Sequence, residues 1–192
     1  KAEGRGRMPL VLSLVVIEGV YKRVGADGWP GVIEELPEVE ALLPATGNTE
    51  VHMKDGVAVQ LIADLLAIVD ERTARGDLGW VAGLGESVAR RVLERVAPRL
   101  ETPLSPERLV AEFPDLWRRL TWQGNARILT EAEGSARLVV DEQVEPRLEF
   151  DAFVAGVLRG SLRRGDGTSA PSVQITACEA LGDAATVFSV HW

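Results

Sequence analysis

The sequence predicts an α+β protein in which a helical N-terminal half is followed by an antiparallel ββαββ unit. Apolar residues recur at helical spacing up to about residue 121. Beyond Gly124 they alternate in short segments that glycine-containing turns separate. We therefore expect a single domain over residues 1–192, mainly helical over 1–122 and ββαββ over 123–192.

The N-terminal segment combines a basic stretch, residues 1–7, with an apolar run over residues 8–17. This imitates the first two parts of a signal peptide, but Glu18 ends the run and no small-residue cleavage site follows. The run is also shorter than the roughly 20 residues that span a bilayer. We expect no membrane span here, and a buried strand or the start of a helix; the pattern does not decide between the two.

The rest of the front half predicts turns and a first amphipathic helix. Residues 25–30 (Gly-Ala-Asp-Gly-Trp-Pro) read as a turn, and residues 36–48 as loops or short helices. Asp55 is positioned to cap a helix that stops at Gly76. Its apolar face carries Val57, Leu61, Ile62, Leu65, Ile68 and Val69.

Two more helices are expected before the sheet. One covers residues 87–97. The other begins at Ser105-Pro106-Glu107, which offers a capping hydroxyl, a proline in the first turn and an acid at the positive helix end. We expect Pro114 to interrupt or restart this helix.

The back half reads as two hairpins around one helix. Residues 126–130 and 136–140 flank Glu133-Gly134, and residues 173–177 and 186–190 flank Leu181-Gly182-Asp183. Between the hairpins, a helix closed by Gly165 carries an apolar stripe. The stripe consists of Phe150, Phe153, Val154, Val157 and Leu158.

Composition limits the partners. The chain has 21 basic and 29 acidic residues and a net charge of −8, so we expect no nucleic-acid binding, which needs a cationic face. One cysteine cannot form an intramolecular disulfide, so a reducing, cytoplasmic location is expected.

Short motifs carry a resemblance to known families. Gly124, Gly156, Gly160 and the ending Cys178…Trp192 resemble the superfamily of 4-vinyl-reductase-type ligand-binding domains, TRAPP vesicle-tethering subunits and haem nitric-oxide-binding (H-NOX-like) domains. A closer resemblance covers most of the chain. It links residues 21–25, Leu36-Pro37, residues 113–117 and residues 188–192 to a paralogous family of uncharacterised myxobacterial proteins.

The resemblance also implies sites that this chain does not reproduce. The 4-vinyl-reductase-type domains carry a metal site with several cysteines, one near the position of Cys178 and another just before the final Phe. Here Thr186 stands two residues before Phe188 and there is no second cysteine. Because a tetrahedral zinc site needs four good ligands, we expect no metal. We also expect no haem or other cofactor, since the Tyr-x-Ser-x-Arg signature is absent and Tyr21 is the only tyrosine.

Isolated reactive residues have ordinary structural interpretations. We expect Cys178 to be a small buried residue and not a reactive thiol. His191 is expected at an edge or surface, and His52 in a solvated loop. Gly156 and Gly160 predict close helix-on-sheet packing, which we prefer to a dimer seam.

The sequence contains no nucleophile elbow, dinucleotide-binding spacing or Walker loop, so we expect no enzyme. The resemblance and the five tryptophans favour a regulatory or sensor module with a small apolar ligand between helices and sheet. The pocket candidates are Trp117, Trp122, Phe153, Val157, Cys178 and Trp192.

The alternative is a ligand-free scaffold that works as a homodimer or binds a protein partner. Its interface candidates lie on one predicted helix and are Leu61, Leu65 and Ile68. The sequence leaves open the ligand, the partner and the oligomeric state.

Overall fold

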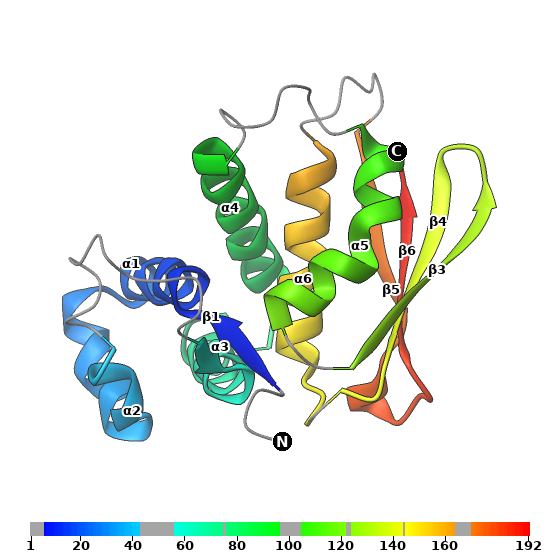
Figure 1. Cartoon of the computed structure of the whole chain (residues 1–192). Coiled ribbons are helices and arrows are strands. Elements are labelled where there is room, and N and C mark those ends of the chain that lie inside the picture. The colour runs from blue at the N-terminus through cyan, green and yellow to red at the C-terminus, as the bar shows by residue number, and fades with distance from the viewer. Residues whose placement is uncertain are drawn as a thin grey trace.

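The computed structural model describes residues 6–42, 56–74, 76–96, 105–121, 124–143, 145–163 and 170–192. They confirm the predicted α+β architecture. Figure 1 shows the N-terminal helices on one side, a layer that contains α4, α5 and α6 in the middle, and the sheet on the other side. The helices and strands are placed as follows.

The front half contains a two-stranded antiparallel pair, β1 with β2, and the helices around it. In chain order these elements are β1 (Arg7–Pro9), α1 (Leu10–Glu35), α2 (Pro37–Glu40), β2 (Gly56–Ala58), α3 (Val59–Thr73), α4 (Gly79–Val96) and α5 (Pro106–Thr121).

The back half has the predicted ββαββ order and forms a four-stranded antiparallel sheet in the order β3-β4-β6-β5. Its elements are β3 (Asn125–Ala132), β4 (Ser135–Asp141), α6 (Leu148–Leu162), β5 (Ser172–Ala177), the short 3₁₀ helix η3 (Glu179–Leu181) and β6 (Thr186–His191).

The apolar N-terminal run is both strand and helix. Met8 pairs with Val57 in the small sheet, and the helix begins at Leu10. Met8, Val16 and Ile17 are buried in the core, which explains why this segment is so apolar. None of the described helices combines the length and the apolar character that crossing a bilayer requires.

The turn predicted over residues 25–30 is wrong except at its first residue. Gly25 has φ 72° and ψ 177° and kinks α1, but the chain is helical again immediately afterwards, with Pro30 inside the helix. Trp29 packs edge-on against Tyr21 across the kink, with ring centroids 5.3 Å apart. Glycine provides the left-handed φ that a side-chain-bearing residue rarely adopts, so one residue suffices for the bend.

Two helix starts, and the continuation of a third helix, differ from the prediction. Val57 lies in β2 and not on the helix, and the predicted cap Asp55 lies outside the described residues. Helix α4 begins at Gly79 and not near residue 87. Helix α5 is capped by Ser105 as expected, with Ser105 Oγ accepting from the Arg108 amide at 3.3 Å, but it runs through Pro114.

The helix continues past Pro114 because its apolar face is buried on both sides of the proline. Phe113 and Trp117 are 4% and 3% exposed, and their ring centroids lie 6.0 Å apart. Burying two aromatic side chains offsets the backbone hydrogen bond that an interior proline removes.

The sheet has one covered face and one open face. Ala136, Leu138 and Val140 of β4 point inward and are buried, while Arg137 between them is exposed. Helix α5 packs on β3 and α6 on β5, so the two helices cover different parts of the same face (Figure 1). Gly134, with φ 77°, forms the β3–β4 turn as the sequence predicts.

Among the described elements, helices α4 and α6 make the most extensive contact, and their backbones lie close together. A Cβ on Gly156 would lie 1.9 Å from the Ala82 carbonyl oxygen, and one on Gly85 would lie 2.2 Å from the Phe153 oxygen. The predicted role of Gly156 and Gly160 in helix-on-sheet packing is therefore wrong: both face α4. Glycines on both helices bring the two backbones together.

An ion-pair network closes one end of this seam. Glu86 of α4 is half-buried and accepts from Arg159 and Arg163 of α6, the second at 2.6 Å. The two arginines lie at the C-terminal end of α6, where cations are also favoured by the helix dipole.

Gly156→Ala should lower the free energy of unfolding by about 1–3 kcal/mol, because the added methyl cannot fit against the α4 backbone. Gly83→Ala on the same seam helix is the matched control: nothing lies within 4 Å of its Cβ position, so helix propensity should raise stability by up to about 1 kcal/mol. Urea unfolding measures both. Equal effects of the two substitutions would contradict the seam.

Candidate functional site

A buried polar cluster lies where α6 begins beneath the end of the sheet. Asp151 is 0% exposed, and its Oδ2 accepts from the Thr186 hydroxyl at 2.9 Å and from the Cys178 thiol at 3.3 Å. The side-chain nitrogen of Gln143, Nε2, donates to Thr186 Oγ1 at 3.1 Å and lies 3.5 Å from Asp151 Oδ1. We call these four residues the Asp151 cluster.

The local structure explains how residues so far apart meet. Asp151 is in the first turn of α6, next to Phe150, whose ring is buried and fixes the helix start. Cys178 follows β5, and its amide donates to Asp183 Oδ2 at 2.7 Å. Through this tight η3 turn the chain returns to Thr186 at the start of β6.

The Thr186 hydroxyl is fully used within the cluster. It accepts from the Glu179 amide at 3.1 Å and from Gln143, and it donates its one proton to Asp151. This one oxygen atom therefore joins three parts of the chain: η3, α6 and the residues that follow β4.

The pKa of Asp151 is raised, first because burial penalises the charged carboxylate; the Glu179 charge adds to this, and the three donors oppose it. Among the described residues, no lysine or arginine forms an ion pair with Asp151. Burial, followed by the Asp151 hydrogen bond and charge, also raises the pKa of the Cys178 thiol. Cys178 is buried, as expected, and its environment disfavours the reactive thiolate.

The backbone between β4 and α6 is strained at two described residues. Glu142 and Glu145 have φ of 55° and 58°, the left-handed region that non-glycine residues seldom occupy. Between them the Gln143 side chain turns inward and is 8% exposed. Its Oε1 is buried without a hydrogen-bond partner.

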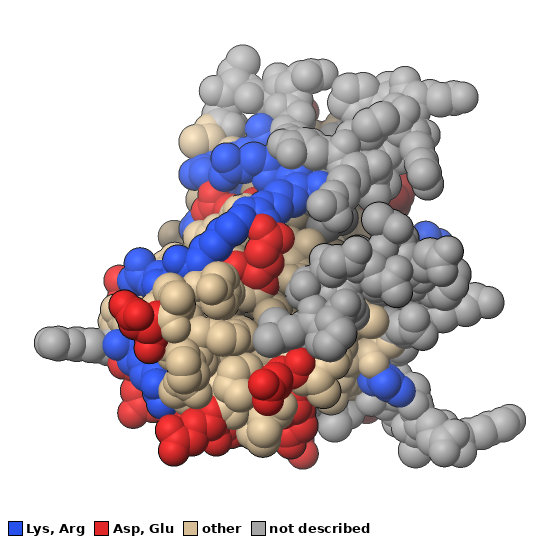
Figure 2. All heavy atoms as spheres, turned by 90° about the vertical axis from the view of Figure 1, so that its left-hand side faces the viewer, with Lys and Arg blue, Asp and Glu red and all other residues tan. Residues whose placement is uncertain are grey.

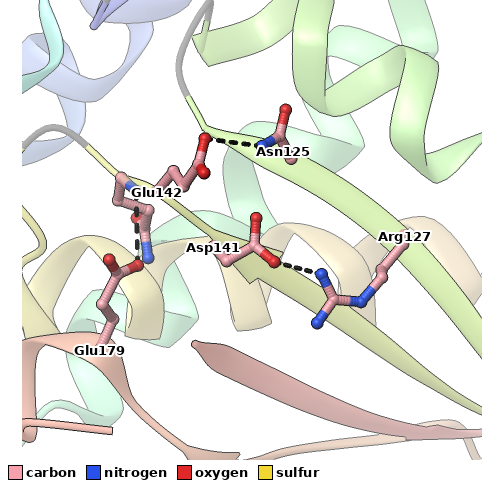
Figure 3. A network of polar contacts seen from close by, with 6 residues as sticks. Asn125, Arg127, Asp141, Glu142 and Glu179 are labelled. Atoms are coloured by element: carbon pink, nitrogen blue, oxygen red, sulfur yellow. Dashed lines mark hydrogen bonds and ion pairs between the residues drawn. The ribbon is translucent and has the colours of Figure 1, made fainter. Parts of the chain in front are cut away.

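Neighbouring elements hold this segment from two sides (Figure 3). From β3, Asn125 Nδ2 donates to Glu142 Oε2 at 2.9 Å, and Arg127 pairs with Asp141. From η3, Glu179 Oε2 accepts from the backbone N–H of Gln143 at 3.4 Å. The geometry that places Gln143 in the cluster is thus fixed from outside it.

The cluster does not fit a metal ion. It unites Cys178 and Thr186, the two positions at which the resemblance implied cysteine ligands, but Asp151 Oδ2 accepts a hydrogen bond from each. A thiol and a hydroxyl that both donate to one oxygen form a hydrogen-bonded core and not a ligand set. Within the described part of the chain, no three His, Cys, Asp or Glu side chains are grouped for metal binding.

A second feature is a row of aromatic rings between α5 and α6. Trp117 contacts Phe150 with ring centroids 6.4 Å apart, and Phe150 stacks on Phe153 at 6.3 Å. With Phe113 these residues form what we call the aromatic row. The structure thus brings together two of the predicted pocket residues, Trp117 and Phe153, through Phe150, which was not among them.

The other pocket candidates are dispersed. Val157 lies at the α4–α6 seam, where its amide is 2.9 Å from the Cβ position of Gly85. Cys178 belongs to the Asp151 cluster. Trp192 donates its indole proton to Glu107 Oε1 of α5 at 2.8 Å, which lowers the pKa of Glu107. Trp122 lies outside the described residues.

The interface candidates lie on α3. Leu65 is 0% exposed and belongs to the core of its own chain, while Leu61 and Ile68 are half-buried. His191 is exposed on the open face of the sheet, as expected of a surface residue, with its Nε2 3.4 Å from Ser189 Oγ. His52 lies outside the described residues.

The face opposite the sheet is mixed in charge (Figure 2). Glu18 of α1 accepts from Lys22 of the same helix and from Arg91 of α4 at 3.3 Å, so acidic and basic side chains alternate there. Acidic and basic side chains of described residues thus share that face (Figure 2).

Sequence reasoning missed Asp151, Thr186 and Gln143. One signal was present: Asp151 is the only charged residue in the apolar stretch from Phe150 to Leu158. A carboxylate inside such a stretch indicates a buried polar partner.

No protein-family model matches the sequence, and comparison with curated proteins finds no match. Solved structures are similar in fold. The Fe(II) unliganded H-NOX protein from K. algicida has a TM-score of 0.68 at 10% identity and covers 96% of each chain. A Fe(II) H-NOX triple mutant from S. oneidensis has a TM-score of 0.66 at 12% identity, over 96% of this chain and 95% of that chain.

A TRAPP complex subunit 3 from Naegleria fowleri, covalently bound to palmitic acid, has a TM-score of 0.53 at 15% identity, over 69% of this chain and 93% of that chain. At these identities the likeness shows the fold alone. The fold is the one shared by H-NOX domains and this TRAPP subunit, which confirms that part of the resemblance.

The described residues do not fit the haem iron of the H-NOX neighbours. Haem iron is held by His, Cys, Met or Tyr. Tyr21 is 43% exposed, His191 faces solvent, and Cys178 donates to Asp151. Met8 offers one buried thioether without an imidazole beside it in the described chain.

Thr186→Val should lower the free energy of unfolding by about 1–3 kcal/mol, since it leaves the Glu179 amide, Gln143 and Asp151 short of a partner in a buried site. Thr176→Val is the control, because the Thr176 side chain is exposed and its hydroxyl makes one 3.4 Å contact with the Val187 oxygen. Its effect should stay within about 0.5 kcal/mol. Chemical denaturation measures the free energy of unfolding of both variants. Equal decreases in the two variants would contradict the role assigned to Thr186.

Proposed function

We propose that this protein is a non-enzymatic regulatory or sensor module that binds a small apolar ligand between its helices and its sheet. The observation that carries the proposal is the aromatic row on the inner side of the sheet. Trp117, Phe150 and Phe153 provide large, rigid apolar surfaces of the kind that line ligand sites.

The way the two helices are anchored supports a ligand at this place. Helix α5 packs mainly on β3, whereas α6 packs mainly on α4. The two helices meet through the Trp117–Phe150 contact and little else among the described residues. A ligand that separates these rings would move α5 against α6 without opening the α4–α6 seam, and this movement is the proposed signal.

The fold neighbours are consistent with this proposal. One H-NOX structure is in an Fe(II)NO ligation state and the TRAPP subunit is bound to palmitic acid, so the fold accommodates small ligands of different chemistry. For this chain we propose an apolar ligand, since the row is aromatic and the described residues do not fit haem iron. The affiliation with the myxobacterial family and the 4-vinyl-reductase-type domains, and the cytoplasmic location, stay predictions from sequence.

The alternative is a dimeric or partner-binding scaffold. Because Leu65 is enclosed by its own chain, this proposal now depends on the half-buried Leu61 and Ile68. The measurement that tests the first proposal also reports subunit number and therefore tests the second.

Protein purified from its own host should show, by native mass spectrometry, a bound mass that disappears on denaturation. At a ligand concentration about 100 times the dissociation constant, binding should stabilise the fold by about 2.7 kcal/mol, which a thermal shift detects. A monomer without bound mass and without a thermal shift across a panel of apolar probes, a long-chain fatty acid included, would contradict the proposal. A ligand-free dimer would favour the scaffold.

The location is tested by two tryptophan substitutions. Ligand binding should change the fluorescence of the wild type and of Trp29→Phe, whose indole packs near the surface on Tyr21. The change should be largely lost in Trp117→Phe, where the reporter in the aromatic row is gone. A change that persists in Trp117→Phe would place the ligand elsewhere.

A further inference from the structure

The sheet ends in two edge strands, β3 and β5, which differ in how they are protected. In the order β3-β4-β6-β5, each of these two strands has a neighbouring strand on one side only among the described residues (Figure 1). The backbone N–H and C=O groups that face outward from such a strand can pair with a further strand. Natural sheets prevent this with charged side chains, prolines or bulges on the edge.

Strand β3 carries protection of this kind. The charged side chain of Arg127 is exposed on it and pairs with Asp141 of β4. The register with β4 also shifts between Thr130 and Ala132, which interrupts a regular edge. A further strand would therefore meet a cation and an irregular backbone at β3.

Strand β5 is less protected. Its residues, Ser172–Ala177, include no Asp, Glu, Lys, Arg or proline, although the chain as a whole has a net charge of −8. The register with β6 shifts only between Ile175 and Ala177, so the strand pairs regularly from Ser172 to Ile175. We call the outward side of Ser172–Ala177 the β5 edge.

The side chains along β5 are complementary to those of the same strand reversed. Val173 is buried and Ile175 is half-buried on the covered face, and Gln174 between them is exposed on the open face. When two copies of β5 run antiparallel about a twofold axis beside Gln174, each Gln174 lies opposite the other. Val173 of one copy then lies opposite Ile175 of the second copy.

This register matches like with like on both faces of the sheet. On the covered face two β-branched apolar side chains meet, which stabilises a strand pair and covers the half-buried Ile175. On the open face two amides meet, and an amide can both donate and accept a hydrogen bond. The complementarity therefore points to a second copy of this chain as the strand that fits the β5 edge.

We propose that β5 pairs with β5 of a second copy, antiparallel and centred on Gln174, so that two four-stranded sheets join edge to edge. A twofold axis is the commonest symmetry of a homodimer, because the same surface is used twice. The proposal concerns a different surface from α3, on which the scaffold alternative depends. It goes beyond ligand binding in the aromatic row and does not need a ligand there.

Charge and size set the strength of this contact. Two copies that each carry a net charge of −8 repel one another, so an uncharged edge is where they can approach most closely. One pair of six-residue strands belongs to the class of small interfaces, below about 1,200 Å². Monomer and dimer should therefore exchange, and the dimer fraction should rise with protein concentration.

The first test measures the dimer dissociation constant by sedimentation of the wild type and of Gln174→Lys. Gln174 is exposed, so the substitution leaves the covered face unchanged, but it places two lysines opposite each other at the twofold axis. Because like charges that face each other across an interface are unfavourable, the dissociation constant should rise at least about tenfold. Leu129→Lys is the matched control, since Leu129 is 45% exposed on the other edge strand, and its dissociation constant should equal that of the wild type.

Two outcomes of this measurement would overturn the proposal. One is a wild type that stays monomeric up to the highest soluble concentration. The other is a dimer that Gln174→Lys leaves intact, which would assign the contact to another surface such as α3.

The second test uses the twofold axis itself and shows that the variants are folded. Gln174→Glu and Gln174→Lys should each be monomeric alone, because each faces its own charge in a second copy. Mixed in equal amounts, the two variants should form a heterodimer, because opposite charges then lie across the axis. A mixture that associates no more than either variant alone would contradict a pairing centred on Gln174.

Discussion

The close approach of α4 and α6 is the constraint on which the rest of the structure depends. Gly85 and Gly156 allow backbone to meet backbone, and Glu86 fixes the register by accepting from Arg159 and Arg163. Because no side chain separates the two helices there, α6 has little freedom to slide or tilt. The α4–α6 contact therefore sets the position of α6 against the front half independently of the residues of the candidate site.

A fixed α6 presents two different chemistries on adjacent residues. Phe150 contributes to the aromatic row, and Asp151, one residue later, is the centre of a polar cluster. The apolar feature faces α5, which is anchored elsewhere, and the polar feature faces the strained segment before α6. The apolar feature therefore lies between α6 and a helix with few contacts to it, whereas the polar feature lies against residues that β3 and η3 hold in place.

The back half could be predicted from sequence because its signals are local. Gly134 forms the hairpin turn, and Ala136, Arg137 and Leu138 alternate between buried and exposed along β4. In the front half, local signals mislead: α5 runs through Pro114, since burial of the neighbouring apolar residues outweighs the proline, and α4 begins at Gly79 and not near residue 87. The apolar pattern identified Trp117 and Phe153. The Asp151 cluster joins residues 8, 27 and 35 positions away from Asp151, and no pattern along the chain encodes such pairings.

The cost of the Asp151 cluster is itself an argument that it does more than fill the core. Well-packed apolar residues of similar volume often replace buried charged groups without loss of stability. Here, within the described part of the chain, a carboxyl without a cationic partner is enclosed beside an amide oxygen without a donor. Glu142 and Glu145, two left-handed residues that each cost about 1–3 kcal/mol, lie nearby in the sequence. Three unfavourable features that share one site are hard to explain by packing. They are tolerated where the polar contacts tie α6, η3 and the residues after β4 to one another, as the Thr186 hydroxyl does.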